Sequence, residues 1–186
     1  MIYKIIYDYK KSYLLLPDLN DLATKMPSYS QRFKAKPRLA NWVAFKASFF
    51  ASENYEGESE QLPDITTWAI GNLVLSPKAY EVFKDCLTPS GEFLPLIIGS
   101  DTYYMFNTLF VIPEEGIDRS HEVEVVDSGV HMGQDNIVFN EAVLDGRDVF
   151  KTPTDKLRYS YCTKAFKNLY EQHAFKGLTF EEVTVS

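Results

Sequence analysis

The stretch LVLSPKAYEVFKDCLTPSGEFLPL, residues 73–96, contains the signals that decide the fold. Its apolar run reaches Ser76, whose hydroxyl can accept the free N–H groups of a first helical turn, and Pro77 suits the first helical position. Apolar residues then recur on one face at helical spacing. They are Ala79, Phe83, Cys86 and Leu87. The stretch therefore predicts a capped helix between two strands.

The chain after this helix predicts a hairpin and then a second capped helix. Pro89 and Gly91 end the first helix, and two strands, 93–98 and 103–112, follow around a turn at 99–101. Pro95 marks its strand as an edge strand or a bulge. The last helix begins near Thr163, with Phe166, Leu169, Tyr170 and His173 on one face, Gly177 as its terminator and a strand at 178–183 after it.

The remaining strands are predicted on both sides of these helices. Residues 1–9 and 12–16 are typical strand sequences, and residues 42–50 alternate with a period of two. We expect Val43, Phe45, Ala47 and Phe49 to form the buried face of that strand. Residues 19–38 predict an irregular connection, and residues 121–126 and 136–144 are strands separated by a glycine-containing link at 129–133.

Composition indicates one folded domain covering 1–186. The hydrophobic fraction is 45% and the aromatic fraction 15%, far from the composition of disordered chains. We expect an α+β fold, mostly antiparallel sheet with two principal capped helices. Its parts would be a β-rich segment 1–60, which includes a basic connection, and an α+β segment 63–186.

The lengths of the apolar runs and the spacing of the cysteines indicate where in the cell the protein is located. No run approaches the roughly 20 apolar residues that span a bilayer, and Lys4 and Asp8 interrupt the N-terminal apolar stretch. Cys86 and Cys162 lack metal-ligand spacing, which favours reduced core thiols. These observations predict a cytoplasmic protein without a membrane partner.

The net charge of −7 is unevenly distributed. Residues 22–52 contain six cations and no acid, whereas residues 53–64 contain five acids and no base. Residues 113–127 contain six acids against Arg119. Because the rest of the chain is so acidic, we expect the basic segment to be solvated or internally paired, and we consider a nucleic-acid partner unlikely.

The candidate nucleophiles have structural explanations. Ser76 lacks the flanking glycines of a nucleophile elbow, and Pro77 removes an N–H that would help form the oxyanion hole. Cys86 lies on the apolar helix face, where a buried thiol is expected. His121 and His131 lack metal-ligand spacing, and Asp145-Gly146 indicates a turn. We predict no catalytic residue, no metal and no cofactor.

Several short motifs occur in an order that matches a known family. They are Pro63-Asp64-Ile65, Leu73 to Ser76, Gly91 to Leu96, Tyr103-Tyr104 to Asn107, and Ile117 to Ser120, followed by Val149 to Lys151, Thr163 to Tyr170 and Gly177 to Phe180. Over residues 63–180 the chain resembles immunity family eleven of the bacterial polymorphic-toxin systems, formerly a domain of unknown function. Pro113 to Gly116 replaces a more hydrophobic link expected there.

The resemblance implies an immunity protein that binds and neutralises a cognate toxin effector, protecting the producing cell and its siblings without catalysis. Acidic side chains could mimic phosphate towards a basic toxin site. The candidate contacts are Glu53, Glu56, Glu58, Glu60, Asp64, Glu114, Glu115 and Asp118. The alternative is an enzyme or small-ligand-binding protein with a site near Tyr103, Tyr104, Asp118 and His131.

Overall fold

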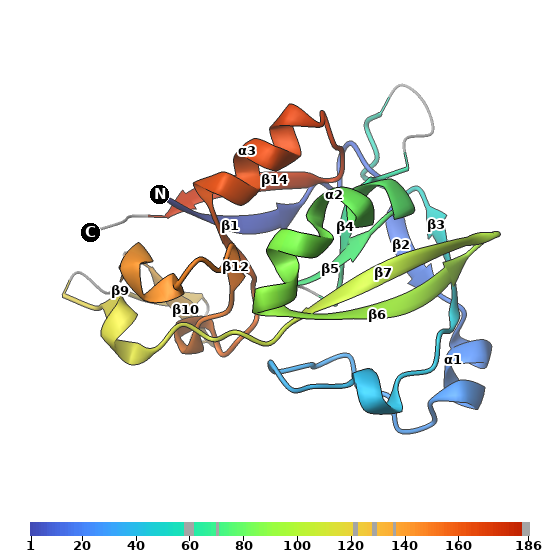
Figure 1. Cartoon of the computed structure of the whole chain (residues 1–186), viewed down its shortest axis with the longest axis horizontal. Helices are drawn as coiled ribbons and strands as arrows, with labels where there is room; N and C mark the ends of the chain where they lie inside the picture. The colour runs from blue at the N-terminus through green and yellow to red at the C-terminus, as the bar shows by residue number, and fades with distance from the viewer. Residues whose placement is uncertain (58–61, 70, 121–122, 128–129, 136, 184–186) are drawn as a thin grey trace.

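The computed structural model describes residues 1–57, 62–69, 71–120, 123–127, 130–135 and 137–183, and of 123–135 only the backbone. Within these residues the chain forms an α+β fold of mostly antiparallel sheets, as the sequence predicts (Figure 1). The helices are α1 (Leu19–Lys25), α2 (Pro77–Leu87) and α3 (Lys164–Gln172). The 3-10 turns are η1 (Leu39–Asn41), η2 (Thr88–Ser90), η3 (Glu114–Gly116), η4 (Glu141–Leu144) and η5 (Pro153–Asp155).

The larger sheet has six strands and is curled. In spatial order they are β2 (Leu14–Pro17), β3 (Lys46–Phe50), β6 (Gly91–Ile98), β7 (Asp101–Thr108), β5 (Asn72–Leu75) and β4 (Ile65–Trp68). The β3–β6 pair is parallel and the other pairs are antiparallel. The outer strands β2 and β4 approach each other, so the sheet is nearly a closed barrel.

The second sheet joins the two ends of the described chain. Its strands, in spatial order, are β12 (Val149–Phe150), β13 (Tyr161–Thr163), β1 (Ile2–Tyr7) and β14 (Leu178–Val183). Because β1 lies between β13 and β14, and β3 pairs with β6, the segments 1–60 and 63–186 share both sheets.

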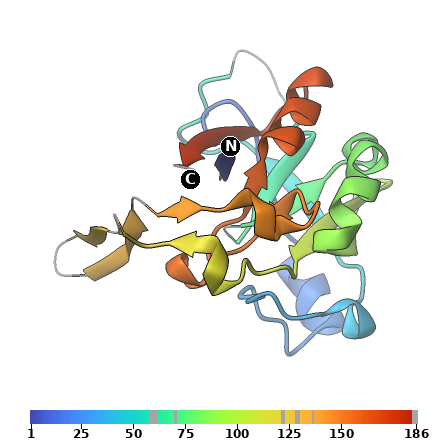
Figure 2. The ribbon, with the colours of Figure 1, turned by 60° about the vertical axis from the view of Figure 1, so that its left-hand side comes forward.

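Two short strand pairs complete the fold. Strand β8 (Ile117–Asp118) pairs with β11 (Val138–Phe139). Strands β9 (Val123–Asp127) and β10 (Val130–Asp135) form a hairpin that projects from the body, as Figure 2 shows. The predicted link at 129–133 is therefore mostly strand, since β10 begins at Val130. In the predicted strand 136–144, β11 takes up two residues and the turn η4 follows it.

The described residues form three hydrophobic clusters. The first lies between the two sheets and contains α2 and α3, whose Phe83 and Phe166 rings have centroids 4.6 Å apart. The second fills the inside of the six-stranded sheet, with Phe45 fully buried. The third lies under β8, β11 and β12 and includes Phe139 and Phe150. Burying these apolar side chains stabilises the fold, and the aromatic ones contribute the largest area per residue.

Both predicted helix caps are confirmed. The Ser76 hydroxyl accepts a hydrogen bond from the Ala79 N–H at 3.2 Å. Thr163 Oγ1 accepts from the Phe166 N–H at 3.4 Å. Each cap satisfies a backbone donor that would otherwise have no intrahelical partner. On α3, Phe166 and Tyr170 are buried as predicted, whereas His173 is exposed at the end of the helix.

The prediction of an irregular connection over 19–38 is wrong at its beginning. Residues Leu19–Lys25 form α1, and the Asp18 carboxylate caps it by accepting from the N–H groups of Asn20 and Asp21, both at 3.0 Å. Asp18 follows Pro17, which ends β2. The helix is only seven residues long, and a segment that short shows little periodicity in sequence.

The predicted strand 42–50 is too long. Strand β3 begins at Lys46, and Val43 is 45% exposed instead of buried. Pro95 lies in the inner strand β6, not at the sheet edge, but it is outside the short β3–β6 pairing. A proline is tolerated there because no β3 carbonyl requires its N–H. Its own carbonyl accepts from Trp42 Nε1 at 2.9 Å.

Gly177 directly precedes β14, whereas α3 already ends at Gln172. The chain turns at Ala174, which has a φ of 51°, and Gly177 has a φ of 112°. A Cβ on Gly177 would lie 2.1 Å from the Ile65 carbonyl oxygen. Glycine is therefore required for the close approach between β14 and β4.

Candidate functional site

The candidate nucleophiles are used as structural groups. Ser76 is buried and caps α2. Burial raises the pKa of the Cys86 thiol to about 12, and the pKa of Cys162 is also raised well above its usual value. Both cysteines are free thiols, and a thiol with a raised pKa is a poor nucleophile near neutral pH.

The residues of the alternative enzyme site are not gathered in one place. Tyr103 and Tyr104 are consecutive on β7, so their side chains lie on opposite faces of the sheet. Tyr103 is buried inside the curled sheet against Phe49, with ring centroids 5.7 Å apart, whereas Tyr104 stacks on Tyr80 at 3.8 Å on the α2 side. Asp118 is exposed on β8. His131 lies in β10, and its side chain is outside the described residues.

The acidic segment 53–64 is fastened to the connection between β1 and β2. Glu53 is exposed. Glu56 is exposed and makes an ion pair with Lys10 at 3.2 Å, and its N–H donates to the Lys10 carbonyl at 2.7 Å. The Asp64 carboxylate accepts from the Lys176 N–H at 3.0 Å and so holds the start of β4 near β14. Glu58 and Glu60 lie outside the described residues.

The second acidic group lies around η3 and β8. Glu114, Glu115 and Asp118 are exposed, Glu114 pairs with Arg119 at 3.2 Å, and Asp118 accepts from the Ser120 N–H at 2.8 Å. Figures 1 and 2 both place this group and residues 52–57 in different parts of the molecule. Those of the predicted acidic residues that the structure describes therefore do not form a single surface.

Residues 29–43, here named the basic strap, cross one end of the six-stranded sheet. Polar side chains of β6 and β7 fasten it: Asn107 is buried and Glu92 is partly buried. The Glu92 carboxylate accepts from the N–H groups of Arg38 and Leu39 at 2.6 and 3.3 Å, and Asn107 Nδ2 donates to the Lys36 carbonyl at 2.9 Å. Sequence patterns did not indicate these contacts, since Glu92 and Asn107 alternate with apolar neighbours as ordinary strand residues.

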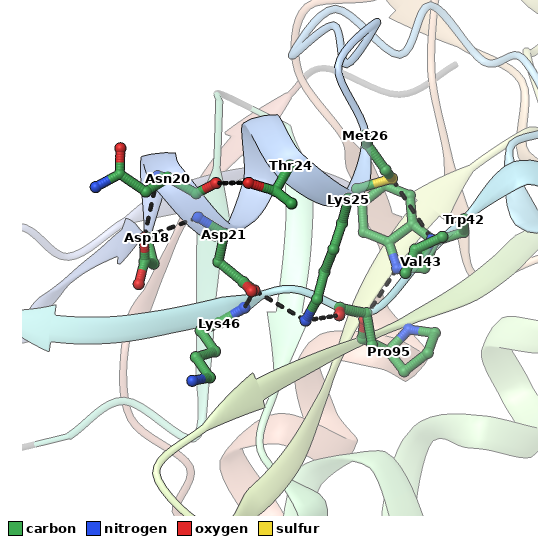
Figure 3. A network of polar contacts seen from close by, with 11 residues as sticks. Asp18, Asn20, Asp21, Thr24, Lys25, Met26, Trp42, Val43, Lys46 and Pro95 are labelled. Carbon is green, nitrogen blue, oxygen red and sulfur yellow. Dashed lines mark hydrogen bonds and ion pairs between the residues drawn. The ribbon is translucent and has the colours of Figure 1, made fainter.

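Helix α1 holds the end of the strap next to β3 (Figure 3). Asp21 Oδ2 accepts from the Lys46 N–H at 2.7 Å and pairs with Lys25 Nζ at 3.0 Å. Lys25 also donates to the Ala44 carbonyl at 2.9 Å. The Lys46 N–H and then the Lys25 ammonium lower the pKa of Asp21 below its usual value. Trp42 is anchored on Pro95 in the same network.

A buried lysine is the main polar feature that sequence reasoning missed. Lys151 is 2% exposed, and its Nζ donates to the carbonyls of Gly71 and Leu157, both at 3.2 Å. Burial lowers the pKa of Lys151 to about 8, an effect that the nearby Asp155 partly offsets. Ser160 Oγ also donates to the Gly71 carbonyl, at 2.6 Å. These bonds tie the β4–β5 connection to residues 151–160.

Two further features were searched among the described residues. No three of their His, Cys, Asp and Glu side chains are close enough to share a metal ion. None of their helices has the length and apolar character needed to cross a bilayer.

Comparison with known proteins adds no relative. No family model matches the sequence, and no curated protein matches it. The resemblance to immunity family eleven therefore stays a prediction.

Proposed function

We propose that this protein is an immunity protein that binds a cognate bacterial toxin effector and neutralises it by covering its active site. The observation that carries the proposal is the pair of charged loops fastened to the fold. Residues 52–57 are held on Lys10, and the basic strap is held on Glu92 and Asn107. Loops ordered before binding lose less entropy on association, which favours a tight protein complex.

The role of the polar groups agrees with binding better than with catalysis. Ser76 and Thr163 cap helices, and Cys86 is held as a thiol by its raised pKa. An occluding inhibitor needs none of these groups for chemistry; it needs a surface that buries about 1,200 to 2,000 Å² with its target. The proposal includes a cytoplasmic location, where free thiols persist.

The test uses the protein encoded by the neighbouring gene as the probe. We expect the two purified proteins to form a complex at a ratio of one to one and protection of cells to require that ratio. Cys86→Ala and His131→Ala should each protect as well as the wild type. A small amount of protein that inactivates a large molar excess of the probe would instead indicate an enzyme, and failure to bind would contradict the proposal.

A further inference from the structure

The basic strap presents three exposed cations. Arg32, Lys34 and Lys36 are exposed, and within the described part of the chain no ion pair is found for them. Two other cations of this region are used internally. Lys25 pairs with Asp21, and the Arg38 guanidinium lies over the Phe33 ring at 4.2 Å and donates to the Arg32 carbonyl at 3.1 Å.

The carboxylate that fastens the strap is directed at backbone groups. Glu92 uses both carboxylate oxygens on the N–H groups of Arg38 and Leu39, and Oε1 also accepts from Asn107 Nδ2 at 2.7 Å. This arrangement fixes the strap backbone and leaves the three cationic side chains exposed. A surface of this kind attracts anionic groups at long range and is already ordered when they arrive.

Two aliphatic side chains of the strap are exposed. Leu39 is 54% exposed and Val43 is 45% exposed. The strap therefore combines a cationic surface with aliphatic contacts, and protein interfaces combine charged rims with apolar centres in this way.

The aromatic side chains of the strap pack against the cluster inside the six-stranded sheet. Phe33 is 2% exposed, and the partly buried Trp42 and Tyr29 are hydrogen-bonded, Trp42 Nε1 to the Pro95 carbonyl and the Tyr29 hydroxyl to Trp68 Nε1 at 2.8 Å. Proteins that bind single-stranded nucleic acid stack bases on accessible aromatic rings. Because its rings are packed against the sheet and against one another, the strap suits an acidic protein surface better than nucleic acid.

We infer that the basic strap is the docking surface for the toxin and that the toxin contacts it with an acidic surface that has an apolar centre. This inference rests on the proposed function, because the toxin is its occupant. It differs from the acidic contact that the sequence suggests. Figures 1 and 2 place the strap and residues 52–57 at opposite ends of the molecule, so the two surfaces can be tested separately.

The local charge favours the strap over residues 52–57. Glu56 is already paired with Lys10, and the next residue after Lys10, Lys11, is also an exposed cation. Positive charge therefore reduces the acidic character of that end. The strap cations face no such compensation in the described contacts.

The experiment compares two variants with the same change in net charge, again with the neighbouring gene's product as the probe. In the first, Arg32→Glu, Lys34→Glu and Lys36→Glu are combined; in the matched control, Lys11→Glu, Lys164→Glu and Lys176→Glu are combined. All six side chains are exposed, so both variants should fold. We expect the strap variant to associate at least about tenfold more slowly at low salt, with a weaker response to added salt, and the control to change less than about threefold.

A second pair of substitutions tests the aliphatic contacts. Leu39→Ser combined with Val43→Ser should speed dissociation at least about tenfold and leave the melting temperature unchanged, since both side chains are exposed. If both strap variants bound the probe as tightly as the wild type does, this inference would be overturned and the proposed function would still stand. Binding lost on Glu53→Lys with Glu56→Lys, and not on the strap variants, would also overturn it. Binding of a nucleic-acid oligomer or anionic vesicles in place of the probe would overturn both.

Discussion

Glu92 Oε1 lies 2.7 Å from the side-chain nitrogen of Asn107, its direct partner in the β6–β7 register. The two side chains lie under the basic strap and bind its backbone at Lys36, Arg38 and Leu39. A single cross-strand pair thus links the six-stranded sheet to the surface that we propose for toxin binding.

Glu92→Ala should destabilise the protein by about 2 kcal/mol, because it leaves two backbone N–H groups and the Asn107 amide without their acceptor. Glu92→Gln, which keeps one acceptor oxygen, should cost about half as much. Urea denaturation measures both values, and hydrogen exchange should become faster at Arg38 and Leu39 in the alanine variant. Unchanged exchange at these two amides would show that Glu92 does not fasten the strap.

Ser76→Ala should cost about 1 kcal/mol of stability, and Thr163→Ala a similar amount, because each removes a helix N-cap. Ser76→Thr keeps a capping hydroxyl and should stay close to the wild type. Neither alanine variant should weaken binding of the neighbouring gene's product at a temperature where the protein is folded. Loss of binding with an unchanged melting curve would give Ser76 a direct functional role.

Lys151 should make stability depend on pH. The pKa of Lys151 is about 8 in the folded protein against 10.5 for a free lysine. Between these pH values the unfolded chain binds more protons than the folded protein, so the free energy of unfolding increases as the pH rises. Relative to Lys151→Met, the wild type should become more stable from pH 8 to pH 10.5 by roughly 1 to 3 kcal/mol. The comparison cancels the titration of other groups. If the stability difference between the wild type and Lys151→Met did not change from pH 8 to pH 10.5, the pKa of Lys151 would be the same in the folded and unfolded protein.

Both cysteines should react slowly with alkylating reagents. Burial raises the pKa of Cys86 to about 12. Because the thiolate fraction falls roughly tenfold for each unit by which the pKa rises, that fraction at pH 8 should be at least about a hundredfold lower in Cys86 than in an ordinary cysteine. Mass spectrometry after iodoacetamide treatment measures the two sites separately. Labelling of Cys86 at the rate of free cysteine would contradict this assignment.

Gly177→Ala should destabilise the protein by more than about 2 kcal/mol, since it adds backbone strain at a positive φ and a clash with the Ile65 carbonyl. Gly99→Ala is the matched control. Gly99 also has a positive φ, of 61°, but a Cβ there meets nothing within 4 Å, so only the strain of about 1 kcal/mol should remain. If both variants lost the same amount of stability, the contact between an alanine Cβ at position 177 and the Ile65 carbonyl would be relieved without a cost in free energy.

Local sequence was enough to predict several elements. The caps at Ser76 and Thr163 join residues three positions apart, the β6–β7 hairpin has its turn at Gly99, and the alternation of Ala47 and Phe49 is a property of one strand. The turn at Asp145 and Gly146, both with positive φ, is equally local. Such features depend on neighbours along the chain, so residue types alone specify them.

Sequence alone did not predict which charges remain uncompensated, because their partners are distant in the chain. Glu56 meets Lys10 across 46 positions, and Glu92 meets Arg38 across 54. Read along the chain, segment 53–64 is a purely acidic surface and segment 22–52 a cationic one. Folding pairs Glu56 with a lysine and uses Glu92 on backbone groups, and thereby leaves the strap cations exposed.

The sequence alone therefore determined an α+β fold and the capped helices α2 and α3, since periodicity, caps and turns act over a few residues. Only the tertiary structure decided that β1 lies between β13 and β14, that β3 runs parallel to β6, and that Lys151 is buried. These outcomes depend on how whole elements pack. The free energy of packing comes from surfaces that meet only once the chain has folded.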